Sequence, residues 1–195
     1  MLDHHPSKTV EAPVVGARKD RPGFRSFKTT QPIVYPCRWH RDILIQATLD
    51  PAISAIQPSD PEFHSEHLFG IVVVRGGEQH LILAVRENCN PDMVSALPEH
   101  LQMTRWQALS EPRCSDARSI WATRHLAVPI GDRLRILGRL AEAECGLPLE
   151  ELAGLVRSSE AEPAAVVLAL VCMGQANVEL RGGLSPSTIL RRRTT

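Results

Sequence analysis

The stretch that most restricts the fold of this chain is HLFGIVVVRGGEQHLILAVRE, residues 67–87. Two runs of aliphatic and β-branched residues flank Gly76 and Gly77, a pair that favours the positive φ angles of a tight hairpin turn. Residues 69–75 and 80–86 are therefore predicted to form a β-hairpin. Because both runs are apolar almost throughout, we expect the two strands to be covered on both faces.

Segments on either side of the hairpin have the spacing of helices and short strands. From Trp39 to Leu49, apolar residues recur at helical intervals, and Asp50-Pro51 is expected to end that helix. The other predicted elements of this half are a strand at 53–57, a helix at 92–100, a strand and the start of a helix at 101–109, and a helix at 115–125 capped by Ser115 or Asp116. Together these elements predict an α/β (α+β) fold.

The last third of the sequence has a different order, with three helical segments followed by two short strands. The predicted helices are 131–146, capped by Asp132 and ended by Gly146, then 147–159, then 162–174 with Pro163 in its first turn. The predicted strands are 176–180 and 187–193, on either side of Gly182 and Gly183. Three helices and a two-stranded wing are the order of a winged helix-turn-helix.

Composition limits the partners that overall charge could attract. The chain of 195 residues has 22 basic and 22 acidic side chains, so any attraction to DNA has to be local. There is no run of about 18 apolar residues, and the opening MLDHHPSKTV lacks the pattern of a signal peptide, so we expect a cytoplasmic protein with no membrane partner. The five widely spread cysteines contain no CxxC pair and are predicted to be free thiols.

These features predict three parts. Residues 1–30 are rich in proline and basic residues without apolar periodicity, and are expected to form a flexible basic arm. Residues 31–126 are predicted to form the helix-and-strand domain, and residues 127–195 a winged-helix-like domain. The basic residues of the arm are Lys8, Arg18, Lys19, Arg21, Arg25 and Lys28. A solvated tail and a phosphate-contacting arm are both compatible with this composition.

The helix before the hairpin supports a resemblance. In HRDILIQATLDPAISAIQP, the pairs Arg41-Asp42, Asp50-Pro51 and Gln57-Pro58 have spacings that resemble the N-terminal endonuclease domain of TnsA-like transposon proteins. This resemblance covers about residues 25–125. It implies a restriction-endonuclease-like fold, a small mixed sheet flanked by helices, here followed by a small winged helix-turn-helix domain.

The family's catalytic residues are not present at the matching positions. The resemblance implies a glutamate on the helix, an aspartate at the start of the hairpin, and an acid two residues before a lysine on the second strand. Aligning that lysine with Arg86 places the second acid at Ala84 and the first at Gly70, and the helix alignment places the glutamate at His40. Mg²⁺ needs carboxylate oxygens, so we predict no catalytic residues, no cofactor and no hydrolysis.

Displaced acids are an alternative that would preserve a nuclease. Asp60, Glu62 and Glu66 lie in the loop before the first hairpin strand, where one of them could replace the missing aspartate. Glu87 follows Arg86 but belongs to another phase of the strand. In this alternative the chain is a metal-dependent endonuclease with displaced ligands; otherwise these acids are solvated.

A structural zinc site is a second alternative. Cys37 and His40 form a CxxH pair, and His64 and His67 form an HxxH pair, which together supply four zinc-type ligands. Such sites usually begin with CxxC, which this sequence lacks. The competing interpretation is that His40 fills the vacated ligand position and the other residues face water.

The basic residues give the candidates for DNA contact. The third predicted helix of the last third has acids at its start and an apolar run from Val166 to Met173, which favours a buried helix or a protein interface over base reading. The candidates for phosphate contact are Arg86, Arg181, Arg191, Arg192 and Arg193. We therefore predict a non-catalytic, transposition-related subunit associated with DNA or with a protein assembly; the alternative is a dimerisation module that uses the apolar helix and binds no DNA.

Overall fold

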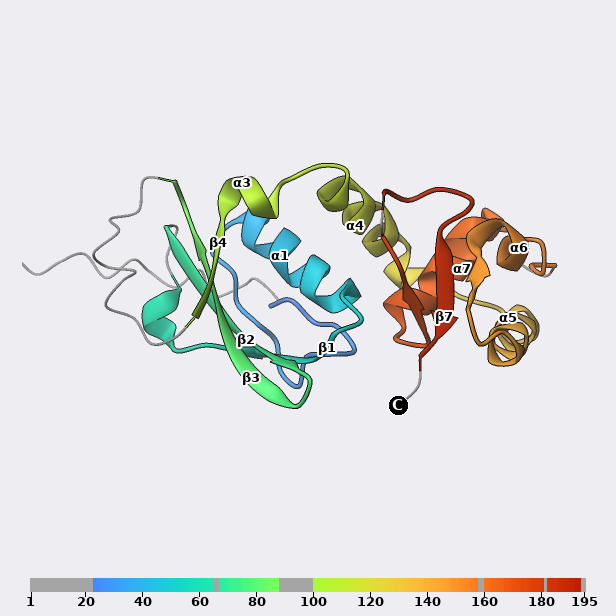
Figure 1. The fold of residues 1–195 in the computed structure, drawn as a ribbon, viewed down its shortest axis with the longest axis horizontal. Helices are drawn as coiled ribbons and strands as arrows, with labels where there is room; N and C mark the ends of the chain where they lie inside the picture. The colour runs from blue at the N-terminus through green and yellow to red at the C-terminus, as the bar shows by residue number, and fades with distance from the viewer. Residues whose placement is uncertain (1–22, 65–66, 88–99, 158–159, 181, 194–195) are drawn as a thin grey trace, which may run out of the picture.

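The computed structural model describes residues 23–64, 67–87, 100–157, 160–180 and 182–193. The mixed α and β composition predicted from the sequence is confirmed (Figure 1). The helices are α1 (Arg38–Leu49), α3 (Arg105–Ala108), α4 (Arg113–Ala122), α5 (Ile130–Glu142), α6 (Leu149–Ala153) and α7 (Pro163–Cys172), with 3-10 turns η1 (Pro61–Phe63) and η2 (Thr123–His125). The strands are β1 (Ile53–Pro58), β2 (Leu68–Arg75), β3 (Glu78–Val85), β4 (His100–Thr104), β5 (Leu147–Pro148), β6 (Ala176–Val178) and β7 (Ile189–Arg192).

The hairpin of β2 and β3 is the centre of a mixed four-stranded sheet. The sheet has the order β1-β2-β3-β4, with β4 parallel to β3 and the other neighbours antiparallel. Gly76 and Gly77 form the turn with φ angles of 60° and 90°, as their positions predicted. The prediction of strands covered on both faces is also confirmed, because Phe69 packs in the main core while Leu68 and Leu83 pack with Phe63 on the other side.

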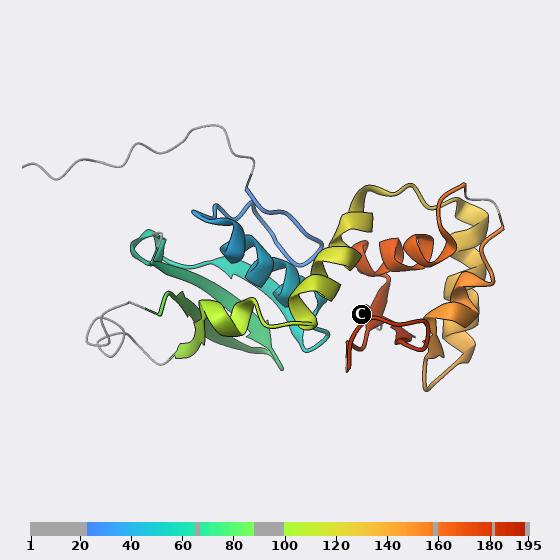
Figure 2. The ribbon, with the colours of Figure 1, turned by 90° about the horizontal axis from the view of Figure 1, so that it is seen from above.

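Helix α1 lies against one face of this sheet (Figures 1 and 2). It covers the predicted range, and its side chains are buried from Trp39 to Leu49 except for Arg41. At its C-terminal end the Nζ atom of Lys28 donates to the carbonyl oxygen of Asp50 over 2.5 Å. A lysine at this end satisfies carbonyl groups that the helix leaves unpaired and complements its dipole.

The last eight residues of the predicted flexible arm are folded. Phe24 is 5% exposed and pairs with Ile33 through two backbone hydrogen bonds, and Thr29 forms a bridge to Ile56 of β1. Lys28 is also 5% exposed. The basic composition suggested solvation, but Phe24 provides an apolar anchor that stacks on Trp121 at 5.0 Å between ring centroids. The part of the arm before Gly23 lies outside the described residues.

The last third contains the predicted three helices and a small sheet of order β5-β7-β6. The predicted antiparallel pair of strands is confirmed by the pairing of β6 with β7. Helix α5 begins earlier than predicted, with Pro129 at its N-cap, because Asp132 turns inward and accepts hydrogen bonds from Arg135 and from the Arg157 N–H. It also ends at Glu142, before Gly146.

Two other helix predictions need correction or fall outside the structure. Helix α4 begins at Arg113 with Pro112 at its N-cap, so Ser115 and Asp116 are inside the first turn instead of capping it. The Asp116 carboxylate instead accepts from the Leu184 N–H at 2.9 Å. The helix predicted at 92–100 falls almost entirely outside the described residues, and its last residue, His100, begins β4.

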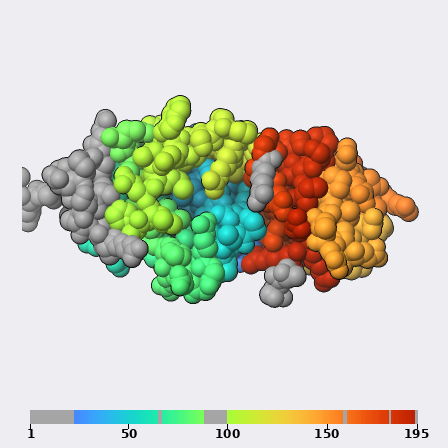
Figure 3. Space-filling model, in the orientation of Figure 1, coloured from blue at the N-terminus to red at the C-terminus, as the bar shows by residue number. Residues whose placement is uncertain are grey.

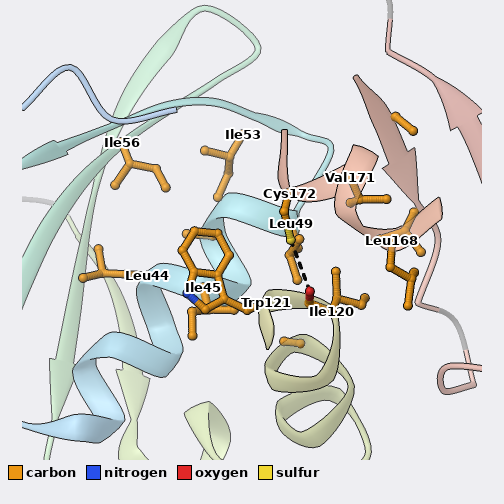
Figure 4. Packing of buried hydrophobic residues seen from close by; sticks show 14 of the residues in the cluster. Leu44, Ile45, Leu49, Ile53, Ile56, Ile120, Trp121, Leu168, Val171 and Cys172 are labelled. Atoms are coloured by element: carbon orange, nitrogen blue, oxygen red, sulfur yellow. Dashed lines mark hydrogen bonds between the residues drawn. The ribbon is translucent and has the colours of Figure 1, made fainter. Parts of the chain in front are cut away.

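One hydrophobic cluster joins the two halves of the chain. It includes Ile45 and Leu49 of α1, Trp121 of α4 and Leu168 of α7 (Figure 4). At the junction the Cys172 thiol donates to the Ile120 carbonyl at 3.2 Å. On the surface, a hollow lies where the two halves meet (Figure 3). It is lined by side chains of α1, of α4 and of the residues around β6. None of the helices formed by the described residues is both long enough and apolar enough to span a membrane.

Candidate functional site

The start of α1 and the β2–β3 hairpin meet on one face of the sheet. The imidazole of His40 stacks on the ring of Phe69, with 4.6 Å between centroids and 16° between planes. Phe69 is paired with Ala84 across β2 and β3. Arg86 follows β3, and its charge helps to lower the pKa of His40. Three of the four predicted positions, His40, Ala84 and Arg86, are therefore brought together.

Gly70 is not part of this group. It is paired with Leu83, and both lie on the opposite face of the sheet from Phe69 and Ala84. A Cβ atom at Gly70 would lie 2.5 Å from the Ser59 Oγ and 2.8 Å from the Phe63 Cβ. Gly70 therefore does not lie beside Ala84, and the residue of β2 that is paired with Ala84 is Phe69.

The pairing of Phe69 with Ala84 can be derived from the position of the turn in the sequence. A two-residue turn at Gly76 and Gly77 pairs Arg75 with Glu78, and counting back along both strands pairs Phe69 with Ala84. A shift of one residue moves a side chain to the other face of a sheet, so the pairing register decides whether Phe69 or Gly70 lies beside Ala84. The residue opposite Ala84 is therefore aromatic. The group formed by His40, Phe69, Ala84 and Arg86 contains no carboxylate.

His40 is held as a neutral imidazole. It is fully buried, and its Nδ1 atom accepts a hydrogen bond from the Cys37 N–H at 3.3 Å, so the ring proton of the neutral form is on Nε2. Burial, followed by the charges of Arg86 and His64, lowers the pKa of His40 to about 3. Such a group does not act as a general base near neutral pH, but its Nε2–H can donate.

Two buried donors at this centre have no hydrogen-bond partner among the described residues. They are the Nε2 atom of His40 and the Nε atom of Arg86. A buried polar group without a partner is costly, and two such donors suit an anionic or carbonyl oxygen. The centre is therefore a set of N–H donors next to an aromatic ring. Such donors are suited to binding a ligand through an oxygen atom, whereas Mg²⁺ would need oxygen ligands from the protein.

His64 lies against the same aromatic ring. Its centroid is 5.3 Å from that of Phe69, and its Nε2 atom is 3.2 Å from the Ser59 Oγ. Burial lowers the pKa of His64, and a backbone hydrogen bond with Gly70 partly opposes the change. The side chain of Ser59 occupies the space beside Gly70, so the Ser59–His64 pair ties the connection between β1 and β2 to the hairpin.

The four residues of the alternative zinc site do not form one. Within the described ranges, no group of three or more His, Cys, Asp and Glu side chains is arranged to hold a metal ion. His40 and His64 each contact the ring of Phe69, and the Nδ1 atom of His40 is engaged with Cys37. His67 is exposed at the edge of the hairpin. The apolar ring of Phe69 thus occupies the space that a shared metal would need.

The candidate displaced acids that the structure describes, Asp60, Glu62 and Glu87, are on the surface. Asp60 and Glu62 are exposed around η1, and Glu66 lies outside the described residues. The carboxylate of Glu87 accepts a hydrogen bond at 3.1 Å from the backbone N–H of Trp106, at the start of α3. No described acid among these candidates is therefore buried at the centre formed by His40 and Phe69.

The basic residues at the end of the chain are mostly engaged within the molecule. The Nε atom of Arg191 donates to Glu179 at 2.6 Å, and the Arg193 guanidinium lies 4.6 Å from the ring centroid of Phe27. Arg192 is exposed, and Arg181 lies outside the described residues. Strands β3 and β7 are in different halves of the molecule (Figure 1), so Arg191, Arg192 and Arg193 do not gather with Arg86.

Helix α7 is packed inside the chain's own core over most of its length. Its side chains from Val166 to Cys172 are all buried in the chain's own core, and Glu162 caps its start by accepting from the N–H groups of Ala164 and Ala165. The prediction of a buried helix is confirmed. Of the run from Val166 to Met173 that the dimerisation alternative uses, Met173 is exposed, at 37%, and the dimerisation module stays an alternative prediction.

Comparison with known proteins adds no relative: no protein-family model, no curated protein and no solved structure matches this chain.

Proposed function

We propose that the chain is a non-catalytic relative of the TnsA-like transposase endonucleases and acts as a DNA-associated or assembly subunit. The observation that carries the proposal is the convergence of His40, Phe69, Ala84 and Arg86 where the start of α1 meets the β2–β3 hairpin. The order of helix, strand and hairpin is the order that the resemblance implies. Under the resemblance, His40 and Ala84 correspond to two of the family's acids and Arg86 to its lysine, and none of these three residues is an acid.

The chemistry of these residues favours binding without cleavage. Metal-dependent hydrolysis of a phosphodiester needs carboxylates to hold the ion that activates water. Here the neutral His40 and the cationic Arg86 offer N–H donors, and a guanidinium does not generate hydroxide. The same donors are suited to a phosphate oxygen, because hydrogen bonds from charged donors to phosphate are strong.

The proposal includes a macromolecular partner. DNA is the partner that the family relationship implies, and a protein of a transposition or integration complex, or a second copy of the chain, would make it an assembly subunit. The surviving endonuclease that uses Glu62 or Glu66 remains an alternative, and it predicts Mg²⁺-dependent nicking that is lost when either acid is changed.

The proposal is tested by the salt dependence of DNA binding. Fluorescence anisotropy of a labelled 20-base-pair duplex is measured at several salt concentrations for the wild type, for Arg86→Ala and for Arg133→Ala, a control from the exposed side of α5. We expect salt-sensitive binding by the wild type. Loss of one phosphate contact in Arg86→Ala should lower the slope of log affinity against log salt by about one.

Two results would count against it. Absence of salt-sensitive binding by the wild type would contradict the association with DNA. If Arg86→Ala still binds DNA and the slope of log affinity against log salt is unchanged, Arg86 does not contact a phosphate. Other basic residues would then have to make the contacts with DNA.

A further inference from the structure

A groove lined by arginines lies between α1 and α4. The two helices are side by side (Figure 2), and the space between their outer faces has a volume of about 520 Å³. Its charged lining residues are Arg38, Arg41, Asp42, Arg118 and Arg124. Four guanidinium groups against one carboxylate give the groove a formal charge of about +3, although the chain as a whole is neutral.

Two of the four arginines are held in place by the fold. The Nε atom and one terminal nitrogen of Arg118 donate to the two carboxylate oxygens of Asp42, at 3.0 and 2.6 Å. Arg124 donates to the Trp121 carbonyl at 3.0 Å, and its guanidinium lies 5.6 Å from the centroid of the Trp121 ring. These contacts fix the directions of both guanidiniums, so little side-chain entropy remains to be lost when a ligand binds.

The other two arginines have no compensating group. Arg38 and Arg41 are three residues apart in the first turns of α1 and line the same groove. Neither forms an ion pair or a side-chain hydrogen bond with another residue in the described parts of the chain. Asp42, the one acid of the groove, is occupied by Arg118. The free positive charge is therefore concentrated on the α1 side.

We propose that this groove binds the phosphodiester backbone of a nucleic acid. Guanidinium groups present paired N–H donors that match phosphate oxygens, and several of them along a groove follow successive phosphates. The remaining lining, Ile45, Trp121 and Ala122, offers no side chain that reads a base edge. The groove thus supplies affinity without sequence choice.

This inference rests on the proposed association with DNA, and it moves the main contact surface. The groove is formed by residues other than Arg86 and the C-terminal arginines, on the side of α1 that faces α4. His40 belongs to the same turn of α1 but packs against Phe69 of the sheet, so it does not line the groove.

The test is DNA binding by the double variant Arg38→Ala/Arg41→Ala. These two residues are chosen because their removal breaks no described contact, whereas Arg118→Ala would leave Asp42 unpaired. Anisotropy of a labelled duplex is measured over a salt series, with Arg133→Ala as a control that removes one exposed charge elsewhere and melting temperature as the check on folding. We expect about tenfold weaker binding and a salt slope lower by about two in the double variant only.

The outcomes separate this inference from the proposed function. Salt-sensitive binding by the wild type that is equally strong in the double variant would overturn the groove and leave the DNA association standing. No binding by the wild type would overturn both. Competition by inorganic phosphate or pyrophosphate as strong as that by unlabelled duplex, per phosphate group, would overturn the assignment to a backbone and indicate a small-anion site.

Discussion

Gly70 is the residue whose surroundings most directly exclude the acid that the resemblance placed there. A Cβ atom would meet Ser59 and Phe63 at less than 3.0 Å, so Gly70→Ala is expected to lower the free energy of unfolding by about 1–3 kcal/mol through overpacking. Gly138→Ala is the control, because Gly138 is in α5 with nothing within 4 Å, and there alanine should stabilise by about 0.5–1 kcal/mol. Urea unfolding of both variants measures the contrast; equal effects would contradict the packing described for Gly70.

His40 makes the stability of the fold depend on pH. Its pKa is about 3 in the folded chain and about 6.5 when unfolded, so the unfolded chain binds more protons between these values. The contribution of neutral His40 to the free energy of unfolding is therefore fully present above pH 6.5 and is lost as the pH drops toward 3. The contribution of His40 should amount to a loss of about 2 kcal/mol between pH 7 and pH 5.

Comparison of variants isolates this contribution. In His40→Leu the difference in the free energy of unfolding between pH 7 and pH 5 should be smaller by about 2 kcal/mol than in the wild type. His125→Leu, which removes an exposed imidazole, is the control for the loss of a histidine. An undiminished pH dependence in His40→Leu would mean that His40 is not held neutral by the fold.

The pair Asp42–Arg118 connects two elements that are far apart in the sequence. It joins α1 to α4 across 76 residues, and the Asp42 side chain is only 8% exposed. Arg118→Ala would leave that carboxylate without its partner and should destabilise by about 2 kcal/mol, less than for a fully buried pair since Arg118 is half-exposed. Arg139→Ala, from an exposed pair, should cost less than about 1 kcal/mol. A double-mutant cycle with Asp42→Ala gives the coupling, and a value near zero would contradict the described contact.

At the level of elements, local sequence patterns were sufficient for the most strongly apolar segments. The helix at Trp39–Leu49, both hairpin strands and the antiparallel pair near the end of the chain were predicted from local spacing. Helix starts were less predictable, because Asp116 and Asp132 form hydrogen bonds with distant or inward groups and lie inside their helices instead of capping them. Short polar residues favour a cap, but a tertiary partner can use the same oxygen atoms.

The site was predictable only in part for the same reason. His40, Ala84 and Arg86 follow from alignment of one helix and one hairpin, whereas Phe69 requires the pairing register between the two strands. The arginines of the groove come from two helices whose packing has no local signature, so no spacing in the sequence groups Arg38 with Arg118. Contacts of this kind depend on the assembled fold.

The whole molecule has a core that includes residues from both predicted domains. Phe24 and Trp121 belong to the same hydrophobic cluster as Leu170 of α7. All three tryptophans, Trp39, Trp106 and Trp121, lie in the first 126 residues, so tryptophan fluorescence reports on that half. We expect the two halves to unfold in one cooperative transition.

Leu170→Ala tests this expectation. Loss of the fully buried side chain should cost about 2–5 kcal/mol and move the urea midpoint of fluorescence together with that of circular dichroism. Leu134→Ala, on the exposed side of α5, should move neither by much. A fluorescence midpoint that stays in place while circular dichroism shifts would show that the halves unfold independently.

The measurement that tests the central claim most directly is a denaturing gel of duplex DNA incubated with the protein at low salt, in Mg²⁺ or Mn²⁺, under conditions where anisotropy shows the duplex to be bound. The account predicts intact strands at every metal concentration, because His40, Phe69, Ala84 and Arg86 provide no carboxylate for a metal. Metal-dependent cleavage that disappears in Glu62→Gln or Glu66→Gln would contradict it and restore the endonuclease.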